Sequence, residues 1–212
     1  MTSVLITGAN RGVGLSLARN YLARGDAVIA VVRQPAAAKE LSALARDNPK
    51  LTVLAADVTE EASLAAAAHA LGATAAVDIL ICNAGIMSNR GGLEGAGNDA
   101  ADWNKVLTTN VTGVFLTARS FIPFVKRAKA GKIAVMSSMM ASSELAAGNA
   151  LGYRASKAAV ANLGANLAVE LKAAGIASAS TIPAGSPPTW AAPARPSHPM
   201  PAPRASSSGS GS

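Results

Sequence analysis

The feature that most constrains the fold of this chain is a regular alternation of short apolar runs with longer amphipathic segments. SVLIT, AVIAVV, LTVLAAD, VDILICNAG and KIAVMSS have the length and composition of strands buried on both faces, and IASAST could begin a sixth. The segments between them have apolar residues at helical spacing. This alternation indicates an α/β fold with a single doubly wound parallel sheet and helices on both of its faces.

Two of the helical segments carry features that predict where they bend or end. Residues 102–128 form one long helical stretch that contains Pro123. Because an internal proline removes a backbone hydrogen bond, we expect a kink or break near Pro123. Residues 153–175 form the last long helix, and we expect Gly175 to be its C-cap because glycine adopts the left-handed conformation readily.

Length and composition favour one domain in a reducing compartment. The 212 residues suffice for a single domain with a substantial core. The single cysteine, Cys82, excludes an intramolecular disulfide, and a small buried residue is its simplest interpretation. No signal peptide is visible before the first apolar run, and the Ala-rich region 62–77 is too weakly apolar for a membrane span. We therefore expect a cytoplasmic protein with no membrane association.

The formal net charge of +7 would suit a nucleic-acid partner if the basic residues were clustered. They are mostly dispersed, and the densest group, within residues 126–132, lies at the expected end of a helix, where cations favour the dipole. We therefore expect no nucleic-acid partner. His69 and His198 have no sequence neighbours that suggest catalysis or metal binding, so we also expect no metal site.

The segment TGANRGVG, residues 7–14, joins the first expected strand to the first expected helix. Gly8, Gly12 and Gly14 allow a tight turn and let the backbone approach a ligand closely. The start of the helix then offers free N–H groups and the positive end of its dipole to a phosphate. Glycines also mark ordinary loops, but a position between strand and helix is the context that dinucleotide binding requires. The turn therefore predicts a site for a phosphate-bearing cofactor.

The spacing TGxxxGxG, with the later motifs AADV, NAG, TTNVTGVF and YRASK, resembles the classical form of the short-chain dehydrogenase/reductase family. The resemblance extends from about Ser3 to about Ala177, and Cys82 stands where the family usually has an asparagine before NAG. It implies a Rossmann-like domain formed by residues 1–182. The implied catalytic residues are Asn110, Ser138, Tyr153 and Lys157. The implied cofactor-binding residues are Gly8, Asn10, Arg11, Gly12, Val13, Gly14, Arg33, Asp57, Val58, Asn83, Ala84, Gly85, Tyr153 and Lys157.

Several of these residues also have purely structural interpretations. Asp57 could cap the following helix, and Asn83 with Gly85 could simply form a turn. Asn110 could be a polar residue that bridges a helix irregularity. Their occurrence together, in the order of the family, favours the functional interpretation.

The residues at the end of the second expected strand indicate which cofactor is used. An acidic residue there binds the ribose 2′-hydroxyl of NAD, whereas an arginine accommodates the 2′-phosphate of NADP. This chain has Val32 followed by Arg33, and Arg11 in the glycine turn adds a second cation. Although Arg33 could be a solvated loop residue, the pairing of guanidinium with phosphate favours NADP(H) over NAD(H).

YRASK places Tyr153 and Lys157 four residues apart on one helix face. A phenol, with a reference pKa of about 10, transfers protons poorly at neutral pH, but a nearby ammonium favours the phenolate. Such a phenol could exchange a proton with a substrate oxygen while hydride moves to or from a nicotinamide. The resemblance implies that Ser138 hydrogen-bonds the substrate oxygen and that Lys157 also holds the nicotinamide ribose. It further implies that Asn110 supports a water-linked proton path.

The segment between Ser138 and Tyr153, MMASSELAAGNALG, is slightly longer than in many classical members. It resembles the carbonyl reductases related to bacterial C-factor and the insect protein sniffer. Ser137 is an alternative to Ser138 as the catalytic serine. Weaker alternatives are Ser142 and Ser143. The methionines that could line a substrate pocket, or fill the core, are Met136, Met139 and Met140.

Residues 183–212 are rich in proline, alanine and serine and carry no strand or helix pattern, so we expect a disordered tail. In the family, a Pro-Gly motif, a substrate helix and a last strand follow the sixth strand, and all three are missing from this sequence. Codons that could encode residues 181–203 can also be read in another frame as HPGWVATDMGGPSASITPDASAA, which contains the motif. We therefore hypothesise a frameshift near residues 177–181.

The leading hypothesis is an NADP(H)-dependent oxidoreductase that acts on a small-molecule carbonyl or alcohol. The alternative is a catalytically impaired nucleotide-binding fragment of the family, because the sequence departs from the family pattern where the substrate helix should lie. The resemblance implies a homo-oligomer for a full-length member and leaves the substrate and the activity of this form open.

Overall fold

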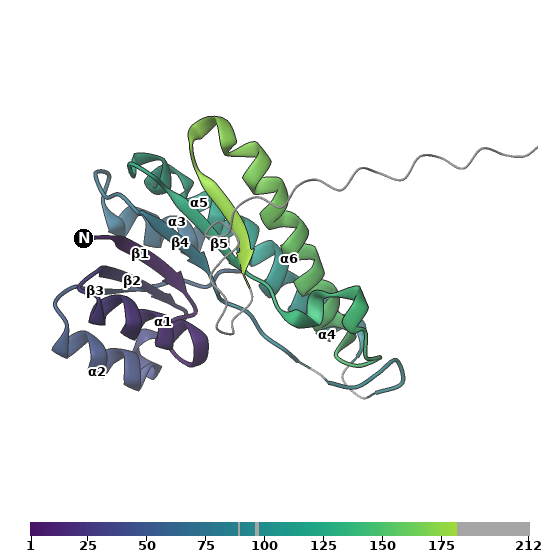
Figure 1. The fold of residues 1–212 in the computed structure, drawn as a ribbon. Helices are drawn as coiled ribbons and strands as arrows, with labels where there is room; N and C mark the ends of the chain where they lie inside the picture. Colours follow the sequence, from purple (N-terminus) through teal and green to yellow (C-terminus); the bar gives the residue numbers. More distant parts are fainter. Residues whose placement is uncertain (89, 96–97, 182–212) are drawn as a thin grey trace, which may run out of the picture.

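The computed structural model describes residues 1–88, 90–95 and 98–181 of the chain. These residues build a parallel sheet with the strand order β3-β2-β1-β4-β5-β6 (Figure 1). The strands are β1 (Ser3–Thr7), β2 (Ala27–Val32), β3 (Leu51–Ala55), β4 (Ile79–Cys82), β5 (Lys132–Met136) and β6 (Ala177–Thr181). Each strand lies inside one of the apolar runs, so the predicted doubly wound sheet is confirmed.

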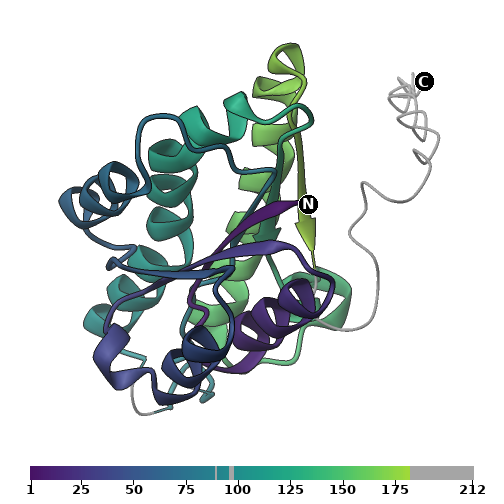
Figure 2. The same cartoon turned by 90° about the vertical axis from the view of Figure 1, so that its left-hand side faces the viewer.

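Helices cover both faces of this sheet. They are α1 (Gly12–Ala23), α2 (Lys39–Asp47), α3 (Glu61–Leu71), α4 (Ala100–Leu107), α5 (Gly113–Arg127) and α6 (Leu151–Glu170). The apolar residues of α1 and α2 pack with Val4 and Ile6 on one face, whereas those of α3, α5 and α6 pack with Leu5 on the other. Figure 2 shows helices on both sides of the strands. Successive residues of β1 therefore belong to two different cores, as the pleat of a strand requires.

The strand order reverses at β1, which positions the site. β1 pairs with β2 through Thr7 opposite Val31, and with β4 through Ile6 opposite Ile81. The connections that leave β1 and β4 run to opposite halves of the sheet, and this divergence opens a crevice at the carboxyl ends of the strands. The motifs predicted to bind a cofactor all follow carboxyl ends of strands, so the fold brings them to this crevice.

The long helical stretch is not broken at Pro123, so the prediction of a break there was wrong. Pro123 lies within α5, which continues to Arg127, and the helix instead changes to a π-helix at Thr108–Thr112. Phe121 and Phe124, on either side of the proline, are buried in the core. We infer that this packing holds α5 together across the hydrogen bond that the proline lacks. The structural interpretation of Asn110, as a residue at a helix irregularity, is confirmed.

The prediction that Gly175 caps the last long helix was also wrong. α6 ends at Glu170, and a short 3₁₀ turn, Lys172–Ala174, follows it before Gly175 adopts a φ of +70°. The chain tightens into 3₁₀ geometry at the end of the helix, as is common at helix C-termini. Gly175 therefore ends the 3₁₀ turn and directs the chain into β6. The predictions for residues 183–212, a disordered tail and a shifted reading frame, lie outside the described residues.

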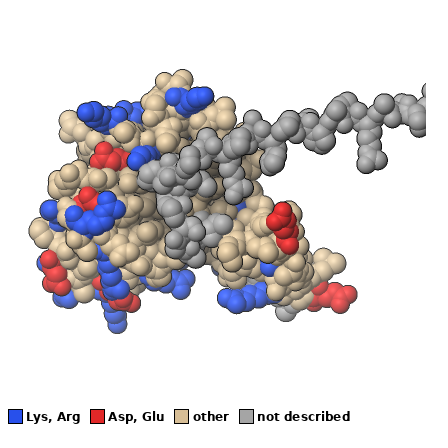
Figure 3. Space-filling view, viewed as in Figure 1, with Lys and Arg blue, Asp and Glu red and all other residues tan. Residues whose placement is uncertain are grey.

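The remaining side chains singled out in the sequence have simple positions. Cys82 and Met136 are buried in the core, which confirms the interpretation of Cys82 as a small buried residue, and Met139 is exposed. None of the helices in the described ranges is long and apolar enough to cross a membrane. The same ranges contain no group of three acidic, histidine or cysteine side chains placed to hold a metal. On the face drawn in Figure 3, basic and acidic side chains are interspersed rather than gathered in one basic patch.

Candidate active site

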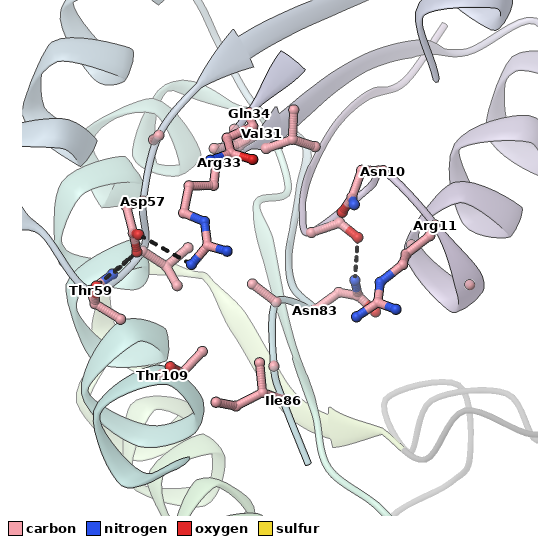
Figure 4. A pocket seen from close by; sticks show the side chains of 18 of the residues that line it. Asn10, Arg11, Val31, Arg33, Gln34, Asp57, Thr59, Asn83, Ile86 and Thr109 are labelled. Carbon is pink, nitrogen blue, oxygen red and sulfur yellow. Dashed lines mark hydrogen bonds and ion pairs between the residues drawn. The ribbon is translucent and has the colours of Figure 1, made fainter. Parts of the chain in front are cut away.

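A cavity of about 770 Å³ opens at the carboxyl ends of β1, β2, β3 and β4 (Figure 4). Its wall includes every residue before Tyr153 that the resemblance assigns to a cofactor. These residues are Gly8, Asn10, Arg11, Gly12, Val13, Gly14, Arg33, Asp57, Val58, Asn83, Ala84 and Gly85. Segments that are far apart in the sequence therefore meet around one space, as predicted from their places after consecutive strands.

The glycine turn forms one wall of this cavity, and its backbone explains why glycine is needed. Gly8 and Gly12 have φ values of +69° and +56°, in the left-handed region that disfavours residues with a side chain. A Cβ at Gly14 would overlap the carbonyl oxygen of Gly8 and lie 2.6 Å from Asn83 Nδ2. α1 begins at Gly12, and Arg11 supplies no side-chain cap to its first N–H groups. This bare, positively polarised helix start fits the phosphate groups of a dinucleotide.

Asn83 and Thr7 tie this turn to the end of β4. Asn83 Nδ2 donates to the carbonyl oxygens of Thr7 at 2.8 Å and Gly8 at 3.2 Å. In return, Thr7 Oγ1 accepts from the backbone N–H groups of Asn83 and Ala84, both at 3.1 Å. The Asn83 side chain therefore holds the backbone of the glycine turn in place.

Arg33 and Asp57 lie together at the carboxyl ends of β2 and β3. Arg33 Nη1 is 3.7 Å from Asp57 Oδ2, and Figure 4 shows the two side chains pointing toward one another, with Arg11 across the pocket in this view. Asp57 also accepts hydrogen bonds from the N–H and hydroxyl of Thr59, at 2.9 and 2.7 Å. Burial alone would raise the pKa of Asp57, but the Thr59 hydrogen bonds and Arg33 outweigh it and hold that pKa below its ordinary value. Asp57 is therefore an anion that orders the start of the following segment.

Asn110, in the π-helix, is fully buried and has every group of its side-chain amide satisfied. Its Oδ1 accepts from Ile86 N at 2.8 Å, and its Nδ2 donates to Ile86 O at 2.8 Å and to Ser156 Oγ at 2.9 Å. Ser156 Oγ in turn donates to Tyr153 O at 2.7 Å. Asn110 thus joins the segment after β4 to α6.

Lys157 lies almost completely buried on α6, with 5% of its surface exposed. Its Nζ donates to Met136 O at 2.7 Å and lies 5.6 Å from the centroid of the Tyr153 ring. Burial lowers the pKa of Lys157 to about 8. A Cβ built on Gly85 would be 3.5 Å from Lys157 Nζ and 3.2 Å from Asn110 Oδ1. Asn110 and Lys157 therefore meet directly behind the cavity wall at Gly85, and the Tyr153 ring lies beside Lys157, although Tyr153 and Lys157 do not line the cavity in the described part of the chain.

Ser137 and Ser138, the alternative catalytic serines, have different environments. Ser137 is buried, and its hydroxyl donates to Lys157 O at 2.8 Å, which ties β5 to α6. Ser138 is partly exposed, and its Oγ accepts from Met140 N at 3.2 Å. Because Ser138 accepts in this bond, its own hydroxyl hydrogen remains available to donate. The geometry thus favours Ser138 over Ser137 as the serine that meets a substrate.

Sequence reasoning missed several residues of this site. Thr7 helps to hold the glycine turn, and Ser156 bonds to Asn110. Lys105 lines the cavity from α4, and Thr109 lines it from the π-helix. Thr7 directly precedes Gly8, and Ser156 lies inside YRASK, so both stood within recognised motifs. Lys105 and Thr109 carried no signal, because only the three-dimensional path of the helix brings them to the cavity.

Comparison with known proteins agrees with this geometry. A family sequence model described as "short chain dehydrogenase" matches residues 2–196. Galactitol 2-dehydrogenase (L-tagatose-forming) from Cereibacter sphaeroides is 35% identical over 175 residues, which cover 81% of this chain and 66% of that protein. The NADPH-bound carbonyl reductase from chicken fatty liver is 34% identical with a TM-score of 0.75, over 83% of this chain and 76% of the other. Carbonyl reductase Sniffer of D. melanogaster is 26% identical with a TM-score of 0.80, over 86% and 80%.

The sheet with a glycine turn at its switch point defines a dinucleotide-binding α/β protein. The chain belongs to the short-chain dehydrogenase family, in its classical form, whose members are oxidoreductases that bind nicotinamide cofactors. It spans 66% of the length of galactitol 2-dehydrogenase and 63% of the length of short chain dehydrogenase andI from Emericella variicolor.

Proposed function

We propose that this chain is an NADP(H)-dependent oxidoreductase that transfers a hydride between the cofactor and a small carbonyl or alcohol substrate. The observation that carries this proposal is the buried Lys157 ammonium beside the Tyr153 ring, directly behind the cavity wall at Gly85. A cation is costly to bury, and a cation placed beside a phenol serves proton transfer.

In carbonyl reduction, Tyr153 gives its phenolic proton to the substrate oxygen, and in alcohol oxidation it accepts that proton. Lys157, whose pKa is about 8, is mostly protonated at pH 7 and stabilises the charge left on the Tyr153 oxygen. Ser138 donates a hydrogen bond to the substrate oxygen and orients it. Asn110 bonds to Ile86, which follows β4, and to Ser156 on α6, and so keeps these two parts of the chain at a fixed separation.

The nicotinamide cofactor supplies or takes up the hydride when it is bound. The turn at Gly8, Gly12 and Gly14 would hold the pyrophosphate, and Asp57 would lie near the adenine. Arg33 and Arg11, which both line the cavity, support a preference for NADP(H), because two guanidinium groups complement a 2′-phosphate. The carbonyl reductase from chicken fatty liver, which is 34% identical to this chain over the aligned residues, is NADPH-bound.

The test is NADPH oxidation by the full 212-residue chain, followed by absorbance, with a panel of aldehydes and ketones. We expect Tyr153→Phe to lower kcat by about 100-fold or more, because it removes the transferable proton. NADPH affinity should stay within about twofold, since the phenyl ring is retained. Tyr21→Phe is the matched control, because Tyr21 lies on α1 and packs against Arg24, outside the cavity.

Turnover by Tyr153→Phe at the wild-type rate would overturn the assignment of Tyr153. Binding of NADPH by the wild-type chain without turnover of any carbonyl or alcohol would instead support the alternative, a catalytically impaired nucleotide-binding member of the family.

A further inference from the structure

The residue after the proposed proton donor has an unusual set of partners. Arg154 lies on the first turns of α6 and directs its guanidinium to the segment 139–149, here called the 139–149 loop. Arg154 Nε donates to Asn149 O at 3.0 Å and, more weakly, to Asn149 Oδ1 at 3.4 Å. Arg154 Nη2 also donates to Asn149 Oδ1, at 3.3 Å. Arg154 Nη1 donates to Met140 O at 3.3 Å and Leu145 O at 2.9 Å. One side chain thus contacts the start, the middle and the end of the loop.

These contacts match the chemistry of a guanidinium. Arginine presents five N–H donors in a rigid planar fork, and carbonyl oxygens approaching from several directions can bind it together. A lysine ammonium in the same place is a single point with a flexible stem, and it could not reach three carbonyl groups spread along the loop. The observed role therefore belongs to arginine in particular.

The 139–149 loop has little other regular structure to hold it. It contains two short 3₁₀ turns, Met139–Ala141 and Ser143–Leu145, and its residues 143–149 are exposed. It ends at Ala150, which is buried and has a φ of +48°, in the left-handed region that disfavours a residue with a side chain. Such a conformation persists only where the surroundings fix it. The N–H of Ala150 donates to Gly91 O at 3.1 Å and to Arg90 O at 3.3 Å, and the bonds from Arg154 to Asn149 act directly beside it.

The loop lies between the two residues that are proposed to contact the substrate oxygen, Ser138 before it and Tyr153 after it. Ser138 immediately precedes the loop, and its Oγ accepts from Met140 N, while Met140 O accepts from Arg154. Tyr153 lies next to Arg154 on α6. A displacement of the loop would therefore move Ser138 relative to Tyr153, and the two hydroxyls must converge on one substrate oxygen.

We propose that Arg154 is a positioning residue that fastens the 139–149 loop to the start of α6 and so sets the distance between Ser138 and Tyr153. The inference rests on the proposed function for its catalytic consequence, but the fastening of the loop is a separate structural claim.

The test compares Arg154→Met and Arg154→Lys with the wild-type chain. Arg19→Met is the matched control, because Arg19 is an exposed arginine on α1 that pairs with Glu40. The first readout is cleavage after Glu144 by a glutamate-specific protease, quantified by mass spectrometry, which needs no activity. The second is the KM for a carbonyl substrate, measured beside the Kd for NADPH and the melting temperature.

We expect cleavage after Glu144 to become about 10-fold faster in Arg154→Met, because a local opening that was held by several bonds becomes more populated. The KM for the carbonyl should rise about 10-fold with the Kd for NADPH unchanged, since the cofactor cavity lies elsewhere. Arg154→Lys should give intermediate values for both, and Arg19→Met should match the wild type.

Wild-type cleavage and KM in a folded Arg154→Met variant would overturn the proposal. A rise in the carbonyl KM that is accompanied by weaker NADPH binding and a lower melting temperature would also overturn it, because such a combination would show general destabilisation. If the wild-type chain turns over no carbonyl, the proposed function fails, yet the cleavage rates still decide whether Arg154 fastens the loop. If Arg154→Met does not fold, the same comparison is made with Arg154→Lys.

Discussion

At the scale of single residues, one buried hydroxyl joins two parts of the proposed catalytic machinery. Ser156 is fully buried, accepts from Asn110 Nδ2 and donates to Tyr153 O. Removal of the Ser156 hydroxyl would leave one amide N–H of Asn110 without a hydrogen-bond partner in the buried core. Such an unsatisfied buried donor is more costly than the bond itself is stabilising.

We therefore expect Ser156→Ala to lower the free energy of unfolding by about 1–3 kcal/mol, the usual cost of a buried unsatisfied polar group. Urea denaturation followed by circular dichroism measures this. Ser42→Ala is the control, because the hydroxyl of Ser42 donates to Pro35 O at an exposed position, and we expect a change of less than about 0.5 kcal/mol. Equal denaturation midpoints for the two variants would contradict the importance of the Ser156 link.

The same scale shows how far the sequence predicts the site. Residue types and spacing predict which residues gather, because cofactor and proton-transfer chemistry require them after consecutive strands. They do not distinguish Ser137 from Ser138, because neighbouring residues at a strand end point to opposite faces. The position of α6 distinguishes them, because the hydroxyl of Ser137 donates to Lys157 O on that helix and is therefore occupied by a structural hydrogen bond.

At the scale of elements, strands are more predictable than helix boundaries. β1, β2 and the other strands lie within apolar runs, since a parallel strand buried on both faces needs little else. The π-helix at Thr108–Thr112 was anticipated only as one interpretation of Asn110, because one widened turn barely changes the spacing of apolar residues. Pro123 attracted the prediction instead, although its neighbours' packing keeps α5 intact.

α6 also carries a buried amine against β5, and this contact gives the stability of the protein a pH dependence. Burial lowers the pKa of Lys157 to about 8 in the folded protein, whereas a lysine in an unfolded chain has a pKa of about 10.4. Between these values the unfolded state binds more protons, so stability rises with pH. Below pH 8 both states are protonated, and the cost of burying the charge is constant.

Relative to Lys157→Met, the wild type should therefore gain unfolding free energy between pH 8 and about 10.4, by up to about 3 kcal/mol. Denaturant titrations of both proteins across this range measure the difference. Burial raises the pKa of Cys82 to about 12, which acts in the opposite direction, but Cys82 is present in both proteins. Lys50→Met, which removes a surface lysine that donates to Gly25 O, should keep the wild-type profile. A pH-independent difference between wild type and Lys157→Met would contradict a charged, buried Lys157.

At the scale of the whole molecule, the cavity draws its wall from both halves of the sheet, so a bound cofactor should stabilise the entire fold. At a concentration of 100 times Kd, a ligand that binds only the folded state adds about 2.7 kcal/mol. For a protein of this size, that corresponds to a rise in melting temperature of roughly 5–10 °C.

We expect NADPH to raise the melting temperature more than NADH at equal concentration, because Arg33 and Arg11 line the cavity and would, as proposed, pair with the 2′-phosphate. Arg33→Ala should remove most of this difference and weaken NADPH binding by about 10-fold or more, the usual effect of losing a charge-assisted hydrogen bond. Differential scanning fluorimetry measures both, with Arg19→Ala as a surface control. Retention of the full NADPH preference by Arg33→Ala would show that Arg33 does not read the phosphate.

The strand order has a consequence for how the chain acquires its shape during synthesis. β2 pairs with β1, β3 with β2, β4 with β1, β5 with β4, and β6 with β5. Each strand after β1 therefore finds one partner that has already left the ribosome. The sheet can grow outward from β1, first to one side and then to the other, in the order in which its codons are read.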